Sequence, residues 1–340
     1  MAFVIHLCCF FPKSIEKYYS TGLYLPLSKV LRMFCHFFFF SIGDWLYLLI
    51  VLIALISIFR YLWLLFKVKE QKKLLILIAV KLIRIFLIIY ILFMLLWGLN
   101  YSRTGIGNQL NIQPLPYSTE DLCNLSQKLT VDLNYCRNKL DSFPQKDTSL
   151  FTIFKIADQA YQQTAVKYPF LQYKYPVLKS SLYTHWASWV GYTGYYNPLT
   201  GEAQVRTDLP RILLPFIACH EAAHQIGYAD ESEASFVALI VSEKSDNVYL
   251  HYSALIDLYR FTRNELFLRN TYPDGPDKLN TGVKNDLLYI RDFFKKETFN
   301  QSQTITNAYD MYLKANGLKK GVESYNDVVA WAINWYRIYY

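Results

Sequence analysis

The sequence predicts a membrane-anchored, mainly helical protein of the α+β class, and three features lead to this prediction. Two long apolar runs, Gly43–Phe66 and Leu74–Gly98, lie in the first third of the chain and are joined by a short basic segment. Most of the remaining chain has the residue patterns of helices. Residues 194–205 instead have the pattern of two short strands around a turn. We therefore expect two transmembrane helices followed by a helical domain with a small β-hairpin or edge strand.

The first segment, residues 1–42, is predicted to lie near the membrane. Met1–Phe11 is apolar, but it is shorter than the roughly 20 residues that a helix needs to cross the hydrocarbon core. Pro12 and Lys13 follow it directly. We interpret it as a remnant first span, an interfacial anchor or an incorrectly assigned start. A cleaved signal peptide is disfavoured because a basic n-region and a small-residue cleavage site are both missing.

Each of the two long apolar runs has the length of a transmembrane helix. Aromatic rings, which favour the membrane–water interface, lie near their ends, among them Trp45 and Trp97. Two buried helices of a soluble core would not need uninterrupted apolar runs joined by a basic loop. We predict spans at residues 43–66 and 74–101.

The connection between the spans sets the predicted topology. It is strongly basic together with the adjoining span ends, and Glu70 is the acid that opposes this charge. Because basic residues collect on the cytoplasmic side of membranes, residues 67–73 are predicted to form a cytoplasmic loop. Residues 102–340 then form one extracytoplasmic domain. The basic residues are Arg60, Lys67, Lys69, Lys72, Lys73, Lys81 and Arg84.

Composition supports this organisation. The net charge of +8 is concentrated near the membrane, which indicates contact with anionic lipid rather than nucleic acid. Cys123 and Cys136 are not expected to form a disulfide, since they lie about 20 Å apart along one predicted helix, Glu120–Leu140.

The segment from His220 to His224 carries the clearest chemical signal, because it has the pattern H-E-x-x-H. Residues four apart share one face of a helix, so both imidazoles can reach one metal ion. Glu221 can then hold a zinc-bound water and take its proton. Pro215 stands where such a helix would begin, and Gly227 where it would end. An ordinary apolar helix would not tolerate three clustered polar groups.

A zinc site of this kind needs a third protein ligand, and three acids follow closely. Asp230 stands at the third-ligand position of the pattern H-E-x-x-H-x-x-G-x-x-H/D. Glu231 fits peptidases whose third ligand is Glu on a second helix, with Ala234 at plus three and Ser235 at plus four. Asp230 and Glu233 are also explained as a helix cap and its capping-box partner. Glu231 is therefore the preferred ligand.

Gly194–Val205 is predicted to form strand, Asn-Pro turn and strand just before the zinc helix. Two interpretations remain open: an edge strand that pairs with extended substrate, and a hairpin that only covers the helix. Four further helices are expected at Tyr252–Leu268, Thr281–Phe299, Thr304–Ala315 and Tyr325–Tyr336. A phenol that stabilises an oxyanion could come from Tyr309, Tyr312 or Tyr325, and none of the three is preferred.

Five segments together are similar to one protein family. They are Trp97–Arg103, Pro198–Ala203, Cys219–Tyr228, Glu231–Ala234 and Tyr312–Gly317. On these residues the chain resembles, over nearly its whole length, the bacterial membrane proteins catalogued as domain of unknown function 3810. The resemblance implies a membrane-anchored, zincin-like domain and supplies no substrate.

The sequence therefore predicts a membrane-bound zinc metallopeptidase of the Glu-zincin type. His220, His224 and Glu231 are expected to bind Zn²⁺, and Glu221 to act as the general base. The expected location is the bacterial inner membrane, which the chain crosses more than once, and the expected substrate is a peptide or protein of the cell envelope. The main alternative is a zinc-binding scaffold or pseudoenzyme without hydrolytic activity. A transport component is disfavoured, because two spans without polar midplane residues offer no pathway.

Overall fold

The computed structural model describes residues 2–143, 145–271, 278–298, 311 and 327–339. The predicted helix Thr304–Ala315, apart from Met311, and the start of the predicted helix Tyr325–Tyr336 lie outside these residues. The candidate oxyanion tyrosines Tyr309, Tyr312 and Tyr325 also lie outside them. The described part is mainly helical with one three-stranded sheet, which confirms the predicted fold class at that level.

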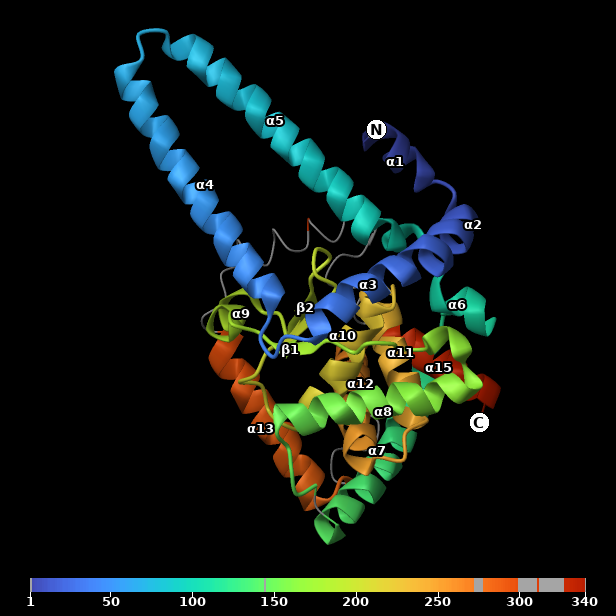
Figure 1. The fold of residues 1–340 in the computed structure, drawn as a ribbon. Coiled ribbons are helices and arrows are strands. Elements are labelled where there is room, and N and C mark those ends of the chain that lie inside the picture. The colour runs from blue at the N-terminus through green and yellow to red at the C-terminus, as the bar shows by residue number, and fades with distance from the viewer. Residues whose placement is uncertain (1, 144, 272–277, 299–310, 312–326, 340) are drawn as a thin grey trace.

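Two long apolar helices form a hairpin that projects from the rest of the molecule (Figure 1). They are α4, Ile42–Lys67, and α5, Gln71–Leu96, and both are long and apolar enough to cross a membrane. The most apolar part of each helix is not buried inside the structure. The second helix ends before the predicted boundary at residue 101, because the chain turns into a 3₁₀ helix, η2, at Gly98–Ser102.

The N-terminal segment lies around the foot of this hairpin. It comprises α1 (Ala2–Cys8), α2 (Pro12–Ser14), the π-helix η1 (Ile15–Leu23) and α3 (Tyr24–His36). The helix α1 packs beside α5, and α3 lies beside the foot of the hairpin (Figure 1). With 13 residues, α3 is too short to cross a membrane.

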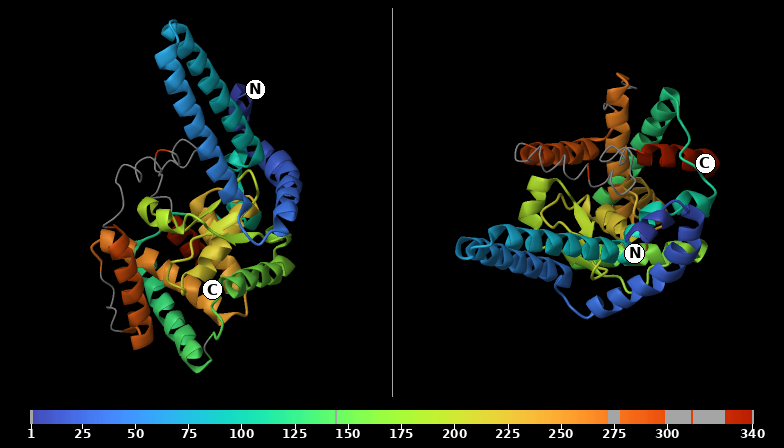
Figure 2. Two further views of the ribbon diagram at one scale, coloured as in Figure 1. Left: turned by 60° about the vertical axis from the view of Figure 1, so that its left-hand side comes forward. Right: turned by 90° about the horizontal axis from the view of Figure 1, so that it is seen from above.

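Beyond η2, helices build a domain around one buried core. At its centre lie α10 (Leu214–Gln225), whose residues are all buried, and α11 (Glu231–Glu243). The helices α8 (Leu150–Lys167) and α12 (Val248–Leu268) also pack against α10. On the far side of α11, α15 (Val328–Tyr339) covers the core. Figure 2 shows that these helices lie beyond the foot of the hairpin, at the end opposite its tip. The domain also contains α6 (Gly105–Leu110), η3 (Pro169–Leu171), α9 (Thr184–Val190) and α13 (Thr281–Thr298).

The helix α7, Thr119–Ser142, extends the predicted helix at both ends. It begins at a capping box, in which the Ser118 side chain accepts from the Asp121 amide and the Asp121 side chain accepts from the Ser118 amide. Cys123 and Cys136 lie on this helix as predicted, and both are unpaired. The polar cap therefore starts the helix at Thr119, one residue before the predicted start at Glu120.

The small sheet has the strand order β1-β3-β2, where β1 is Leu178–Ser180, β2 is Gly194–Tyr196 and β3 is Ala203–Val205. The strands β2 and β3 are antiparallel, so the predicted hairpin is confirmed, and β2 is an edge strand. The parallel strand β1 and the helix α9 were not anticipated from the sequence.

The turn of this hairpin holds the first turn of α4. The carboxylate of Glu202 accepts hydrogen bonds from the amides of Ile42 at 3.1 Å and Gly43 at 2.5 Å. Ser41 caps the same helix by accepting from the Asp44 amide at 3.1 Å. Both Glu202 and Asp44 are fully buried. The free amides at the start of α4 are thus satisfied by the domain.

Replacing Glu202 by alanine is expected to lower the free energy of unfolding by about 1–3 kcal/mol, because buried helix amides lose their acceptor. Thermal unfolding of the full chain in detergent measures this loss. Glu70→Ala is the matched control, since the Glu70 side chain is 73% exposed in its ion pair with Lys73. Equal unfolding midpoints for the two variants would contradict the anchoring role of Glu202.

Candidate metal centre

A sharp turn after α10 brings the third acid back to the two histidines. Gly227 has φ +96°, a left-handed conformation that favours glycine. The amide of Gly227 donates to the His224 carbonyl at 3.0 Å, and the amide of Tyr228 donates to the Ala223 carbonyl at 3.1 Å. These two bonds define a Schellman ending, so the predicted helix end at Gly227 is confirmed. Glu231 then starts α11.

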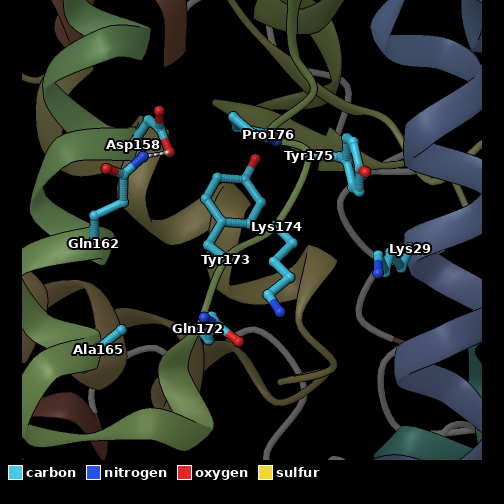
Figure 3. Close-up of a pocket in the computed structure, with 9 residues that line it drawn as sticks. All are labelled: Lys29, Asp158, Gln162, Ala165, Gln172, Tyr173, Lys174, Tyr175 and Pro176. Carbon is cyan, nitrogen blue, oxygen red and sulfur yellow. Dashed lines mark hydrogen bonds between the residues drawn. The ribbon is translucent and has the colours of Figure 1, made fainter.

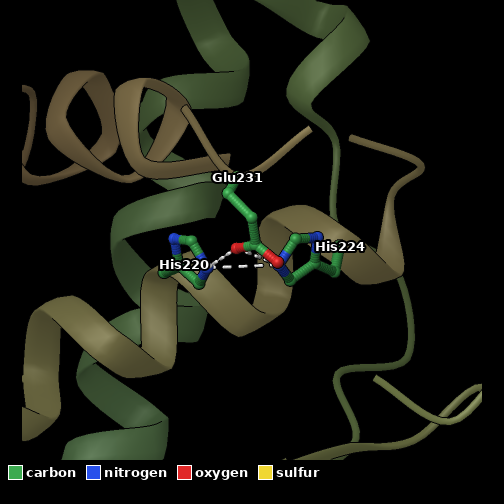
Figure 4. Close-up of side chains that lie close together, drawn as sticks. All are labelled: His220, His224 and Glu231. Carbon is green, nitrogen blue, oxygen red and sulfur yellow. Dashed lines mark hydrogen bonds and ion pairs between the residues drawn. The ribbon is translucent and has the colours of Figure 1, made fainter. Parts of the chain in front are cut away.

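His220, His224 and Glu231 form one buried group (Figure 4). Nε2 of His220 lies 3.0 Å from Oε2 of Glu231, and Nε2 of His224 lies 3.3 Å from the same oxygen. The two Nε2 atoms are 3.1 Å apart. Ligands about 2.0–2.1 Å from a tetrahedral zinc ion are separated from one another by roughly 3.3 Å. The three side chains therefore have the spacing that a tetrahedral metal ion requires.

The other ring nitrogens of the two histidines also have partners. Nδ1 of His224 lies 2.7 Å from the Tyr228 carbonyl, which accepts its proton and leaves Nε2 free to bind a metal. Nδ1 of His220 lies 3.1 Å from Oγ of Ser235. Ser235 thus stands at the orienting position that its plus-four spacing from Glu231 predicts.

The charges of this group favour a cation. Burial opposes ionisation of Glu231, but the neighbouring His224 and His220 outweigh it and hold the pKa of Glu231 below its usual range. Burial also opposes a charge on His224, yet Glu231 raises the pKa of His224 to about 9. Without a metal, a proton on His224 supplies the positive charge that the buried carboxylate needs.

Glu221 is buried beside this group. Burial raises its pKa to about 7, whereas the charges of His220 and His224 lower it. Its Oε2 atom has no hydrogen-bond partner among the described residues. The edge strand β2 passes close to this carboxyl group at Gly194, where an added Cβ atom would lie 2.6 Å from the carboxyl carbon of Glu221. The same atom would lie 2.8 Å from the Gln204 carbonyl oxygen, so glycine leaves room for both the Glu221 side chain and the neighbouring strand.

The two neighbouring acids lie outside the group. Oδ1 of Asp230 accepts from the amides of Ser232 at 2.9 Å and Glu233 at 3.1 Å, so Asp230 is the predicted N-cap of α11. The Glu233 carboxyl group lies against Gly105, and burial raises its pKa to about 8. Of the three candidate acids, Glu231 alone joins the histidines in the described structure.

The N-terminal segment closes the C-terminal end of α10. The Gln225 carbonyl accepts from the hydroxyls of Tyr24 at 3.0 Å and Ser28 at 2.9 Å, and from Nη1 of Arg32 at 2.9 Å. Nε1 of Trp97, just beyond α5, donates to the His224 carbonyl at 3.3 Å. Sequence reasoning missed these contacts. Their signal is a row of polar residues in α3 with helical spacing inside an otherwise apolar segment.

A separate pocket lies between α3 and α8 (Figure 3). It contains none of the metal-binding candidates. Its Tyr173 hydroxyl donates to the side-chain oxygen of Gln225, so the pocket shares a wall with the end of α10. The lining residues are Lys29, Asp158, Gln162, Ala165, Gln172, Tyr173, Lys174, Tyr175 and Pro176.

Comparison with protein families adds an assignment. The family described as "Protein of unknown function (DUF3810)" matches residues 19–333. The chain belongs to this family. No curated protein and no solved structure matches the chain. The matched region of this DUF3810 protein includes both α10 and α11, so the buried His-His-Glu group lies within the family's domain.

Single alanine variants of the three acids are expected to separate ligand from cap in the DUF3810 protein. Glu231→Ala should lose bound metal, because it removes one of three donors. Asp230→Ala should keep the metal and lose about 0.5–2 kcal/mol of stability, since it removes an N-cap. Elemental analysis and thermal unfolding of the folded variants measure both effects, with Glu233→Ala as a second acid outside the group. Full occupancy in Glu231→Ala would exclude it as a ligand.

Gly194→Ala is expected to destabilise the DUF3810 protein by about 1–3 kcal/mol, because the new methyl group overlaps the Glu221 carboxyl group. The loss should be smaller in a Glu221→Ala background. Unfolding midpoints of the two single variants and the double variant give this coupling. Gly22→Ala is the control, since its nearest contact is 3.2 Å from the added atom. Equal losses in both backgrounds would show that Gly194 does not accommodate Glu221.

Proposed function

We propose that this protein is a membrane-bound zinc metallopeptidase of the Glu-zincin type. One observation carries the proposal: His220, His224 and Glu231 present three buried donor atoms within 4.8 Å of one another, and Glu221 stands beside them. Three protein donors leave the fourth tetrahedral position open, as in catalytic rather than structural zinc sites.

The donor set supports zinc as the metal. Two imidazoles and one carboxylate suit zinc and other transition metals, whereas calcium and magnesium prefer oxygen ligands throughout. The hydrogen bond from Nδ1 of His224 to the Tyr228 carbonyl favours a ring whose Nε2 atom can coordinate. The burial of the group fits a site that holds its ion tightly.

Zinc held here would polarise a peptide carbonyl and acidify an attacking water molecule. Glu221 is the proposed base. One oxygen of its carboxylate accepts the proton of the water and then passes it to the nitrogen of the leaving amine as the C–N bond breaks. A pKa of about 7 suits this task, because the group can both accept and release a proton near neutral pH.

The edge strand β2 supports the first of the two interpretations left open for the hairpin. It lies at one edge of the sheet, and its Gly194 touches the Glu221 side chain. An extended peptide that pairs with this edge would lie beside the base. The proposed substrate is therefore a peptide or protein segment of the cell envelope in an extended conformation.

The proposed location is the bacterial inner membrane. The exposed apolar helices α4 and α5 would cross it, the basic connection after Lys67 would face the cytoplasm, and the metal domain would be extracytoplasmic. Lipid and envelope polypeptides, rather than nucleic acid, are the proposed partners.

A zinc-binding scaffold without hydrolytic activity is the second candidate, and one observation favours it. His220, His224 and Glu231 are only 9%, 4% and 7% exposed, so substrate access requires β2 or a neighbouring segment to move. The two candidates share the zinc site and differ in whether Glu221 performs chemistry.

Glu221→Gln is expected to retain zinc and to lower peptide hydrolysis about 10²–10⁴-fold, because the amide cannot take up the proton. Elemental analysis and turnover of a peptide library by the full chain measure the two properties. Glu120→Gln, at an exposed position in the first turn of α7, is the control. Zinc binding without hydrolysis in the unaltered chain would favour the scaffold, and loss of zinc in Glu221→Gln would show a structural role for Glu221.

A further inference from the structure

The short helix α1 packs on the end of α5. Its buried Ile5 belongs to the same apolar cluster as Met94, and Tyr90 and Ile91 pack against that cluster. Nδ1 of His6 lies 3.5 Å from the Tyr90 hydroxyl. Because a helix rises 1.5 Å per residue, Tyr90 lies about 9 Å before the end of α5 at Leu96. The helix α1 therefore lies beside the last two turns of α5.

The outward side of α1 is apolar. Phe3 is 73% exposed, and Val4 and Leu7 are exposed as well. Just after the helix, Phe10 and Phe11 continue this apolar surface. If the last turns of α5 lie in hydrocarbon, a helix packed beside them lies at the same depth. Its outward side chains then contact lipid, and their exposure has a physical reason.

The helix α3 is amphipathic in the opposite sense to a surface helix in water: its polar side faces the protein, and its apolar side faces outward. Its side chains Ser28 and Arg32 are buried against the end of α10, where both donate to the Gln225 carbonyl. Its outward side carries Val30, which is 57% exposed, and Met33, which is 40% exposed. Phe34 and Phe37 continue this apolar surface at 63% and 81%. A helix whose outer side faced water would place its polar residues outward.

The charges of the segment are suited to a lipid surface. Its exposed charged side chains are the basic Lys13, Lys17 and Lys29. Glu16, the single acid between residues 1 and 40, is paired with Arg103 at 2.7 Å and turned inward. An apolar surface with basic residues around it matches the acyl chains and anionic headgroups of a bilayer.

We propose that residues 2–40 form a second membrane-contacting unit, with the phospholipid bilayer as its partner. The helix α1 enters the outer leaflet beside α5, and α3 lies along the outer membrane–water interface with Val30, Met33 and Phe37 toward lipid. The proposal rests on the proposed membrane crossing by α4 and α5, whose lipid-facing surface it continues. It goes beyond that crossing, because a hairpin alone would leave α3 in water.

The unit has a direct connection to the metal centre. The buried side of α3 binds the last carbonyl of α10, one residue after His224. Lipid contact along the opposite side of α3 therefore holds the metal-binding helix at a fixed height above the membrane.

Photo-crosslinking tests the proposal on the full chain in vesicles of neutral and anionic phospholipids with a carbene precursor on the acyl chain. Mass spectrometry then maps the labelled residues. Cross-links are expected on Phe3, Val4 and Leu7 of α1 and on Val30 and Met33 of α3, in addition to α4 and α5. Equally exposed apolar residues of the domain outside residues 2–40 and the hairpin serve as internal controls and should remain unlabelled: Phe143 at 83% and Phe151 at 77%.

The outcomes distinguish the two proposals. Labelling of α4 and α5 without labelling of α1 and α3 would overturn the membrane-contacting unit and leave the crossing intact. Equal labelling of Phe143 and Val30 would also overturn it, because the cross-links would then reflect exposure alone. No labelling of α4 and α5 would overturn the crossing itself. Zinc content, measured on the same sample, tests the metal site independently.

Discussion

The chain reversal after His224 is the constraint on which the rest of the structure depends. In the His-His-Glu group, Oε2 of Glu231 lies 3.3 Å from Nε2 of His224, although only six residues separate the two. A helix that continued past Gln225 would carry Glu231 away from the histidines. The left-handed Gly227 ends α10, and the Tyr228 carbonyl, presented by the same turn, orients the His224 ring. One turn therefore brings Glu231 to the histidines and orients the ring of His224.

The turn does not stand alone, because Arg103, just after η2, holds it and is itself held by the N-terminal segment. Nη1 of Arg103 donates to the Gly227 carbonyl at 2.9 Å, and its guanidinium group lies 4.7 Å from the ring centre of Tyr228. Glu16 binds the other side of Arg103. Burial opposes charge on this arginine, but Glu16 keeps its pKa above the usual value. The ion pair thus ties the start of the chain to the residues that shape the metal group.

Local pattern made part of this structure predictable. The H-E-x-x-H spacing, the plus-three and plus-four residues after Glu231 and the Asn-Pro turn are all contained in short stretches, and helix or hairpin geometry converts each directly into position. The long apolar helices are equally local signals. The contacts of Ser28 and Arg32 with Gln225 join residues almost 200 positions apart. The helical spacing of these polar residues marks one side of α3 for burial, but it does not identify the end of α10 as the partner. The packing of Gly194 on Glu221 is likewise a property of the tertiary fold, as is the burial of Glu202 at the start of α4.

The shared end of α10 has a practical consequence for dissecting this protein. A usual route to a water-soluble fragment of a membrane protein is to delete the anchor and express the remaining domain. Here a cut after Ser102 would remove every donor that now binds the Gln225 carbonyl, together with Trp97 at the His224 carbonyl. It would also uncover the wall of the core on which Tyr24 lies fully buried. The segment that looks like an anchor in the sequence is, by its contacts, one wall of the domain, and the two must be purified as one piece.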